Sequence, residues 1–323
     1  MPFLSDKHIM NKTPILIALG GNALILPEDK GYIEEQFIHT SACMKPIAEL
    51  ISRGMTVIIT HGNGPIVGNI LLRNECAKNF IPPMPLYICV ADSQGGIGSM
   101  MAESLNNELK RIGINKTVSA VITHILVDNN DPAFQNPTKP IGPYYSDSDA
   151  EFYMRMGWSM KKIPERGWRR LVPSPKPKKI LELEAVKALL KQNIIPIASG
   201  GGGIPVIEEN GITRGVDAVI DKDLSASLLA RDLSLKRFFI LTDVDGVYLN
   251  WGSADRKKVN ALTIKDAEKY LAEGHFPPGS MGPKIEAAIE FLKSGGQEVI
   301  ITKPEDLIAA MDGKRGTQIV KSA

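Results

Sequence analysis

Short runs of apolar residues alternate along this chain with segments whose apolar positions recur at helical spacing. The clearest run is residues 15–19, where apolar side chains occupy both faces, as in a parallel strand covered by helices on each side. Similar runs predict further strands at residues 55–60, 118–127, 194–198, 238–242 and 298–302. Helices are predicted between them at residues 101–112, 180–191, 224–231, 264–273 and 284–293. This alternation predicts a three-layer α/β/α sandwich with a mainly parallel central sheet.

Residues 128–179 interrupt this pattern. The segment holds eight of the 22 prolines and has poor periodicity, apart from a short helix expected near residues 148–156. Long irregular segments are usually functional or disordered, and aromatic residues such as Tyr144 and Trp158 argue against disorder. We therefore expect a small protruding subdomain at about 128–179 that closes over a functional site.

Charge and cysteine content narrow the class of protein. The 38 basic and 36 acidic residues leave a net charge of +2, which attracts neither nucleic acid nor a membrane surface. Cys43, Cys76 and Cys89 have no metal-binding spacing, so a reducing compartment is expected. Residues 1–12 are polar, unlike a signal peptide, and no apolar run approaches the roughly 18 residues of a membrane span. We expect a cytoplasmic protein with no nucleic-acid or membrane partner.

Glycine-rich turns follow three of the predicted strands, at the edge where parallel sheets collect ligands. Without a Cβ, a glycine lets its backbone N–H approach an anion closely. The four consecutive glycines at 200–203 favour binding, because a plain connection does not need them. The turn at 62–64 taken alone is equally compatible with a tight strand-to-helix connection.

Three lysines stand in unusual surroundings. Lys284 lies at the start of a predicted helix, where its charge opposes the helix dipole unless an anion is bound. Lys222 lies between Asp221 and Asp223 before another helix. This arrangement is either a surface ion pair or a phosphate site in which Asp223 holds the lysines in place. Lys139 lies in the irregular segment, and its spacing alone indicates only a loop lysine.

The turn at residues 241–248 ends a predicted strand with polar residues, and it fits a capped turn and the floor of a nucleotide pocket equally well. His61 and His124 also end predicted strands, but no Ser or Cys partner suggests a catalytic triad, so we expect them to be polar pocket or packing residues. The chain has no Walker A loop and no protein-kinase motif set.

Seven motifs in order resemble the amino-acid kinase superfamily and, more narrowly, its carbamate kinase family. They lie at residues 18–23, 60–65, 131–142, 199–205, 216–223, 241–245 and 279–284 and cover nearly the whole chain. Many members of the superfamily carry a lysine in the first strand, where this chain has Ala18. In carbamate kinases a lysine of the protruding segment replaces it, and Lys139 stands in the matching motif.

The resemblance implies a phosphotransferase that moves a phosphoryl group reversibly between ATP and carbamate, with Mg²⁺ held mainly by the nucleotide phosphates rather than by protein ligands. It implies catalytic roles for Lys139, Lys222, Asp223 and Lys284. Binding of carbamate and the transferred phosphoryl group falls to Gly20, Gly21, Asn22, Gly62, Asn63, Gly64, Gly201 and Gly202. Nucleotide binding falls to Thr242, Asp243, Asp245, Tyr248, Met281 and Gly282.

The resemblance also implies a homodimer, with a carbamate-binding and dimerisation part at 13–215 and a nucleotide-binding part at 216–323. The expected net direction is from carbamoyl phosphate and ADP to ATP and carbamate, which yields ammonia and CO₂, as in arginine metabolism. One alternative is a sister kinase acting on another small carboxylate or phosphonate, against which Ala18 and the motif at 131–142 argue. Another is a non-catalytic metabolite-binding module, against which the presence of all three lysines argues.

Overall fold

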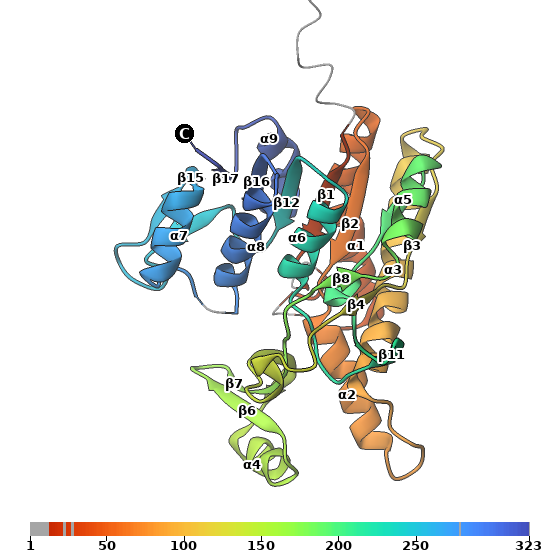
Figure 1. The fold of residues 1–323 in the computed structure, drawn as a ribbon, viewed down its shortest axis with the longest axis vertical. Coiled ribbons are helices and arrows are strands. Elements are labelled where there is room, and N and C mark those ends of the chain that lie inside the picture. The colour runs from red at the N-terminus through yellow and green to blue at the C-terminus, as the bar shows by residue number, and fades with distance from the viewer. Residues whose placement is uncertain (1–12, 22–23, 27–28, 278, 323) are drawn as a thin grey trace, which may run out of the picture.

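The computed structural model describes residues 13–21, 24–26, 29–277 and 279–322. An eight-stranded sheet forms its centre (Figure 1), and its neighbouring strands are parallel except for the last two in the chain. The order across the sheet is β15 (Ala261–Thr263), β17 (Thr317–Val320), β16 (Glu298–Thr302), β12 (Arg237–Leu241), β1 (Ile15–Leu19), β2 (Val57–His61), β9 (Ile195–Ile197) and β3 (Val118–Ala120).

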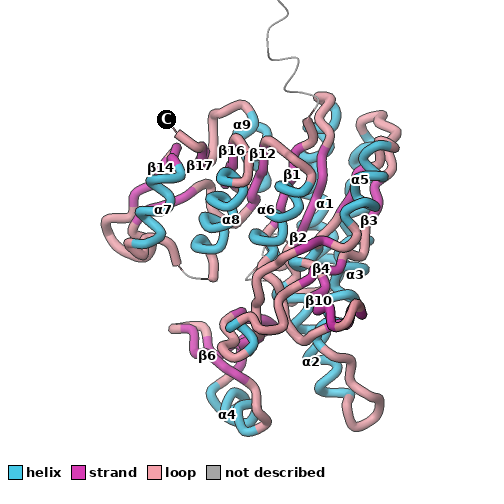
Figure 2. The backbone as a smooth tube through the Cα atoms, viewed as in Figure 1, coloured by secondary structure: helices cyan, strands magenta, loops and turns pink. Residues whose placement is uncertain are grey.

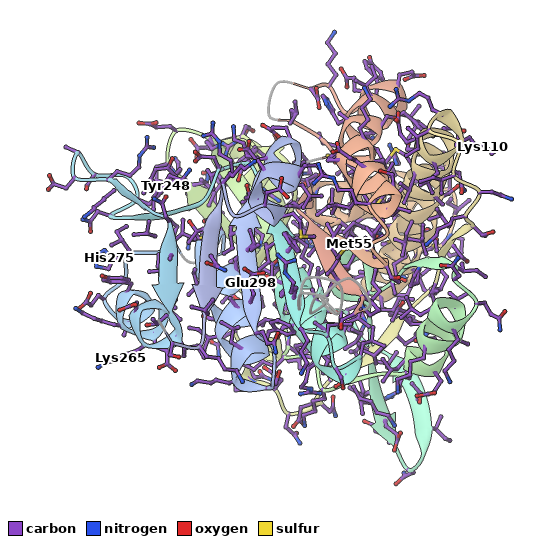
Figure 3. The ribbon with its side chains drawn as sticks, turned by 90° about the horizontal axis from the view of Figure 1, so that it is seen from above. Met55, Lys110, Tyr248, Lys265, His275 and Glu298 are labelled. Atoms are coloured by element: carbon purple, nitrogen blue, oxygen red, sulfur yellow. The ribbon has the colours of Figure 1, made fainter. Side chains whose placement is uncertain are left out.

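Helices cover both faces of this sheet, as the view from above shows (Figure 3), so the predicted three-layer sandwich is confirmed. In β1, Ile15, Ile17 and Leu19 pack into one layer. Leu16 and Ala18 pack into the other, because side chains alternate along a strand. The first layer contains α1 (Ile33–Ser52), α3 (Leu86–Arg111) and α9 (Leu307–Met311). The second contains α5 (Leu183–Lys191), α6 (Lys222–Asp232), α7 (Ile264–Ala272) and α8 (Met281–Lys293).

The expected strand at 118–127 is wrong as a single element. Its first part is β3 in the large sheet, and its second part is β4 (His124–Leu126) in a separate four-stranded sheet. Thr123 marks the change of sheet, and its backbone N–H donates to Oε1 of Gln94 at 2.8 Å. The other strands of this sheet are β8 (Lys179–Ile180), β10 (Ile204–Glu209) and β11 (Ile212–Gly215), and β13 (Val247–Leu249) pairs separately with β14 (Lys257–Val259).

Two predicted helices differ in extent from the observed ones. The segment at 101–112 is the second half of the longer α3, and the helix expected from residue 180 begins at Leu183, after β8. The long helix α1 was not predicted, although apolar side chains on one of its faces fill the core.

The segment at 128–179 is folded, although its strands were not predicted. It forms a three-stranded antiparallel sheet in the order β5 (Lys139–Tyr145), β7 (Gly167–Val172) and β6 (Ser159–Ile163). The expected short helix is α4 (Asp147–Arg155), and a single 3-10 turn, η4, spans Pro132–Phe134. This protruding subdomain lies beyond one end of the large sheet (Figures 1 and 2).

A contact between two glycines seats the subdomain on α2 (Gly64–Ala77). A Cβ on Gly68 of α2 would lie 1.9 Å from the Cα of Gly142 in β5, so the two backbones touch where no side chain fits. The subdomain is thereby fixed next to the N-terminus of α2. Within the described ranges, no helix has the length and apolar composition that crossing a bilayer requires.

Candidate active site

Glycine-bearing loops meet where β1 and β2 end. The N–H of Gly62 donates to the carbonyl of Leu19, and the N–H of Gly20 donates to the carbonyl of Leu241, each at 2.9 Å. A Cβ on Gly62 would lie 2.7 Å from the backbone nitrogen of Gly21. The two loops can approach this closely only because position 62 is a glycine.

The glycines after β9 lie at the same edge of the sheet, but only some of them line the cavity. Gly201 lines the cavity with φ +64°, and a Cβ there would lie 2.1 Å from the side-chain nitrogen of Asn63. Gly202 lies outside the cavity lining, and a Cβ on it would lie 2.2 Å from the carbonyl oxygen of Ile220. Gly202 therefore packs against the backbone of Ile220, and its contact with a ligand stays a prediction.

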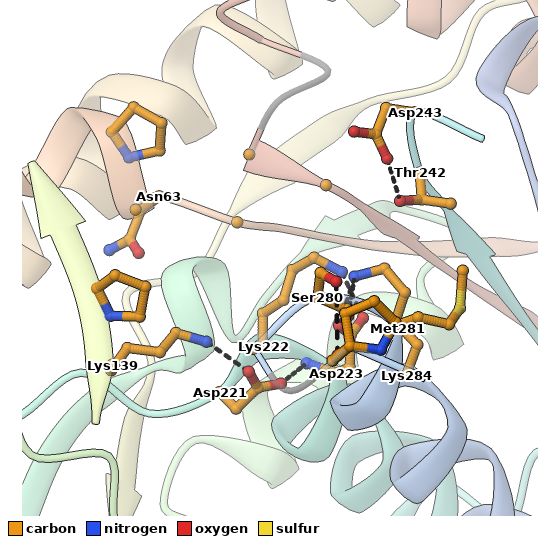
Figure 4. Close-up of a pocket in the computed structure, with 18 of the residues that line it drawn as sticks. Asn63, Lys139, Asp221, Lys222, Asp223, Thr242, Asp243, Ser280, Met281 and Lys284 are labelled. Carbon is orange, nitrogen blue, oxygen red and sulfur yellow. Dashed lines mark hydrogen bonds and ion pairs between the residues drawn. The ribbon is translucent and has the colours of Figure 1, made fainter. Parts of the chain in front are cut away.

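These loops form one wall of a cavity of about 480 Å³ (Figure 4), a size typical of small-molecule sites. Fourteen of the residues predicted from the sequence line it: Gly20, Gly21, Gly62, Asn63, Gly64, Lys139, Gly201, Lys222, Asp223, Thr242, Asp243, Tyr248, Met281 and Lys284. Asp245 and Gly282 do not line it, and Asn22 lies outside the described residues.

The N-terminus of α6 organises one side of the cavity. Asp221 caps the helix, because its Oδ1 accepts a hydrogen bond from the N–H of Asp223 at 2.9 Å. The other oxygen of Asp221 pairs with Nζ of Lys139 (Figure 4), which comes from β5 of the protruding subdomain. One carboxylate thus links the subdomain lysine to the helix start.

Asp223 joins the other two lysines. Its Oδ1 pairs with Nζ of Lys222, and its Oδ2 lies 3.3 Å from Nζ of Lys284 on α8. The ammonium of Lys284 also donates to the carbonyl of Ser280 at 3.2 Å. Lysines from β5, α6 and α8 therefore converge on two neighbouring aspartates, and Asp223 makes the contacts expected of an organiser.

Burial and charge act against each other in this cluster. Burial raises the pKa of Asp223, but Lys222 and Lys284 outweigh it, so the pKa is lowered and the carboxylate stays ionised. Burial lowers the pKa of Lys222 despite its pairing with Asp223. Burial also acts to lower the pKa of Lys284, but Asp223 and Asp221 raise it above its usual value. The site therefore holds positive charge in a nearly dry place, where it interacts strongly with an anion.

The far part of the cavity is formed by the turn after β12. Thr242 donates from its hydroxyl to Oδ1 of Asp243 at 3.0 Å, and both residues line the cavity. Asp245 instead accepts hydrogen bonds from Tyr248 at 2.7 Å and from Lys258 at 2.6 Å. Its position there fixes Tyr248, which does line the cavity.

His61 lies just beneath this edge and is fully buried. Its Nδ1 lies 3.1 Å from the carbonyl oxygen of Gly62. Burial lowers its pKa to about 4, since a charged imidazole would lack water there. The imidazole is therefore neutral at pH 7 and donates from Nδ1, which fits the packing role expected from the sequence.

Three further charged residues of the cavity were not assigned from the sequence. Asp221 was visible as one of the two aspartates that flank Lys222, and its cap position before a helix was the available signal. Arg166 and Arg169 line the cavity from the protruding subdomain. Their segment showed no strand pattern, so nothing in the sequence indicated which arginines face inward.

The fold and the site define the class of protein. A model of the amino acid kinase family matches residues 13–303. The chain is 48% identical over 308 residues to a carbamate kinase of Pyrococcus horikoshii, covering 94% of this chain and 98% of that protein. It is 44% identical over 316 residues to the carbamate kinase-like protein YahI of Escherichia coli, covering 96% of this chain and 100% of that protein.

A solved structure agrees with these sequences. Carbamate kinase from Giardia lamblia bound to AMP-PNP matches with a TM-score of 0.88 and 39% identity, over 96% of this chain and 99% of that one. The chain therefore belongs to the amino acid kinase family and, within it, to the carbamate kinases, which are phosphotransferases.

Proposed function

We propose that this chain catalyses reversible phosphoryl transfer between ATP and carbamate. In the direction of ATP synthesis, carbamoyl phosphate and ADP give ATP and carbamate, which decomposes to ammonia and CO₂. The observation that carries the proposal is the convergence of Lys139, Lys222 and Lys284 on Asp221 and Asp223 beside the glycine loops.

The step needs positioning and charge rather than a general base. A terminal phosphate oxygen of ADP bonds to phosphorus as the bond from phosphorus to the carbamate oxygen breaks. The attacking oxygen is already anionic and carbamate leaves as an anion, so no proton has to be moved. Lys139 and Lys222 would neutralise the oxygens of the migrating group, and Lys284 the nucleotide phosphate side. The two aspartates keep the three ammonium groups in place before the substrates arrive.

The glycine loops would hold the carbamoyl end of the substrate. Gly21, Gly62 and Gly64 line the cavity beside the lysines, and bare backbone there can donate to phosphate oxygens without a side chain intervening. Asn63 donates from its side-chain nitrogen to Oγ of Ser93 at 2.8 Å, which fixes the loop before binding.

The nucleotide would lie toward Thr242, Asp243, Tyr248 and Met281, which line the opposite part of the cavity. Among the described residues, no group of three or more His, Cys, Asp or Glu side chains could hold a metal ion. The donor set fits Mg²⁺ held mainly by phosphate oxygens and water, with Asp243 as a lining carboxylate that forms no ion pair with a lysine of the described ranges. When bound, Mg²⁺ would neutralise charge on the nucleotide phosphates.

A coupled assay tests the proposal directly. Purified protein mixed with Mg²⁺, ADP and carbamoyl phosphate should form ATP, which luciferase light detects. Acetyl phosphate in place of carbamoyl phosphate serves as the control, and it should support much slower ATP formation. ATP from acetyl phosphate alone would favour a sister kinase, and no ATP from either donor would refute the proposal.

Two further expectations of the family belong to the proposal. We expect a homodimer, which light scattering of the purified protein would report as twice the mass of the 35.2 kDa chain. We also expect a cytoplasmic location, which fractionation of the source cells would test. A monomeric mass, or recovery with the membrane fraction, would contradict the respective expectation.

A further inference from the structure

Two arginines of the protruding subdomain form a part of the cavity wall with no role in the mechanism above. Arg169 lies on β7, and Arg166 lies in the turn between β6 and β7. Because side chains alternate along a strand, β7 turns Arg169 toward the cavity and Arg170 away from it. The guanidinium of Arg170 instead lies 3.8 Å from the centre of the Trp158 ring.

Both inward-facing guanidinium groups are held in place by one aromatic ring. The ring centre of Tyr144 lies 4.8 Å from Cζ of Arg166 and 5.1 Å from Cζ of Arg169. Nε of Arg169 also donates to the carbonyl of Ile141 in β5 at 3.2 Å. These contacts orient the guanidinium planes without neutralising their charge.

The arginines differ from the lysines of the site in their electrostatics. Each lysine of the cluster has a carboxylate partner, whereas within the described ranges neither Arg166 nor Arg169 forms an ion pair with a carboxylate. Burial lowers the pKa of Arg169, a hydrogen bond to the Tyr144 side chain partly opposes this, and the charge of Arg166 makes a smaller lowering contribution. Arg166 is exposed and Arg169 is half-buried, and an anion bound in the cavity would relieve the repulsion between their two like charges.

The contacts of Arg169 place it on the carbamoyl side of the cavity. It bonds to Ile141, two residues from Lys139 on the same strand. That strand packs through Gly142 against α2, whose first residue, Gly64, lines the cavity. The residues assigned to the nucleotide come instead from the turn after β12, from β13 and from α8.

We propose that Arg166 and Arg169 bind the phosphate group of the acyl phosphate substrate, which in the proposed function is carbamoyl phosphate. The inference rests on that function for the identity of the substrate. A guanidinium presents several N–H donors in one plane and matches two phosphate oxygens with parallel hydrogen bonds, whereas an ammonium group acts as a point charge. The arginines capture the substrate, and the paired lysines stabilise the migrating group.

Kinetics of single substitutions test the assignment. Arg169→Gln and Arg166→Gln should each raise the KM for carbamoyl phosphate about tenfold or more, as loss of a charged hydrogen bond does. The KM for ADP should change less than twofold. Arg155→Gln removes an exposed charge from α4 of the same subdomain and should change neither constant. Equal rises in both KM values, or no rise in either, would overturn the assignment.

Tyr144 is a positioning residue in this scheme, and it gives a second, milder test. Tyr144→Leu removes the ring beneath both guanidinium groups and should raise the KM for carbamoyl phosphate roughly two- to fivefold with kcat retained. Tyr144→Phe keeps the ring and should restore the normal KM. A Phe variant as impaired as the Leu variant would contradict the stacking role.

Titration with inorganic phosphate separates this inference from the proposed function. In calorimetry without nucleotide, the Arg166→Gln, Arg169→Gln double variant should bind phosphate at least tenfold more weakly than the unsubstituted chain. If the double substitution weakens phosphate binding but the unsubstituted chain forms no ATP, the proposed function is refuted and the arginine site is retained. Phosphate affinity that the double substitution leaves unchanged would refute the arginine site even if ATP forms.

Discussion

The two walls of the cavity carry positive charge in contrasting ways. On the side of α6 and α8, Lys222 and Lys284 share the two oxygens of Asp223. The two lysine side chains are at most 12% exposed and that of Asp223 is 4% exposed. On the side of the protruding subdomain, Arg166 and Arg169 rest on Tyr144 with no carboxylate partner in the described part of the chain. Paired charge is fixed in position before the reaction, whereas unpaired charge is available to attract a substrate.

The largest effect is expected from Asp223→Asn, which keeps the shape of the side chain and removes its charge. Two buried ammonium groups would lose their partner, so the free energy of unfolding should fall by about 3–5 kcal/mol. Chemical denaturation measures it. Asp312→Asn, in an exposed pair with Arg53, is the control and should cost less than about 1 kcal/mol. Equal losses in the two variants would show that the ion pairs of Asp223 contribute no more to stability than an exposed pair.

The second-largest effect is expected on the turnover rate when a lysine of the site is removed. Lys222→Ala and Lys139→Ala should each lower kcat by about 10²–10³, because each removes charge from the developing transition state. Both variants should remain folded by circular dichroism. Lys293→Ala, farther along the helix that carries Lys284 and 58% exposed, is the control and should keep full turnover. Unchanged ATP formation in either active-site variant would refute the catalytic role of that lysine.

The buried imidazole of His61 predicts how the stability of the fold depends on pH. Its pKa is lowered from 6.5 to about 4, so the unfolded chain binds the proton more tightly and stability falls as pH drops from about 6.5 to 4. The full contribution of this shift is about 3 kcal/mol. His61→Gln should remove that part of the slope in denaturation curves measured across this range.

The control for this measurement is His275→Gln, a substitution at a partly exposed ring that should keep the slope. A slope that survives in the His61 variant would show that another titrating group carries it, and would contradict the prediction.

The smallest expected effect concerns the contact that holds the protruding subdomain against α2. Gly68→Ala should cost about 1–3 kcal/mol, since its Cβ would overlap the backbone of Gly142. It should also raise the KM for carbamoyl phosphate by displacing the arginine wall. Gly95→Ala, a helical glycine whose Cβ would meet open space, should instead stabilise by up to about 1 kcal/mol. Equal stability of the two variants, measured by thermal unfolding, would show that the close contact of Gly68 with Gly142 is not needed to hold the subdomain in place.

The regions that the sequence predicted well are those where local pattern and tertiary environment agree. β1 is apolar on both faces because both faces are covered, so its pattern is readable without the structure. The short strand β6 is largely exposed and rich in lysine, so its pattern carries no such signal. The division at residue 215 stays a prediction, since the large sheet continues across it through the pairing of β1 with β12.

What the sequence determined by itself was the layered fold, the glycine loops at the strand ends and the residues able to carry phosphate chemistry. Periodicity and glycine placement are local properties, and they survive without knowledge of distant contacts. The tertiary structure alone decided which charges meet: Lys139 with Asp221, Lys284 with Asp223, and Arg169 with the cavity rather than the outer surface. The paired residues are 82 positions apart for Lys139 and Asp221 and 61 apart for Lys284 and Asp223. Contacts between residues so distant in sequence depend on the packing of the whole chain.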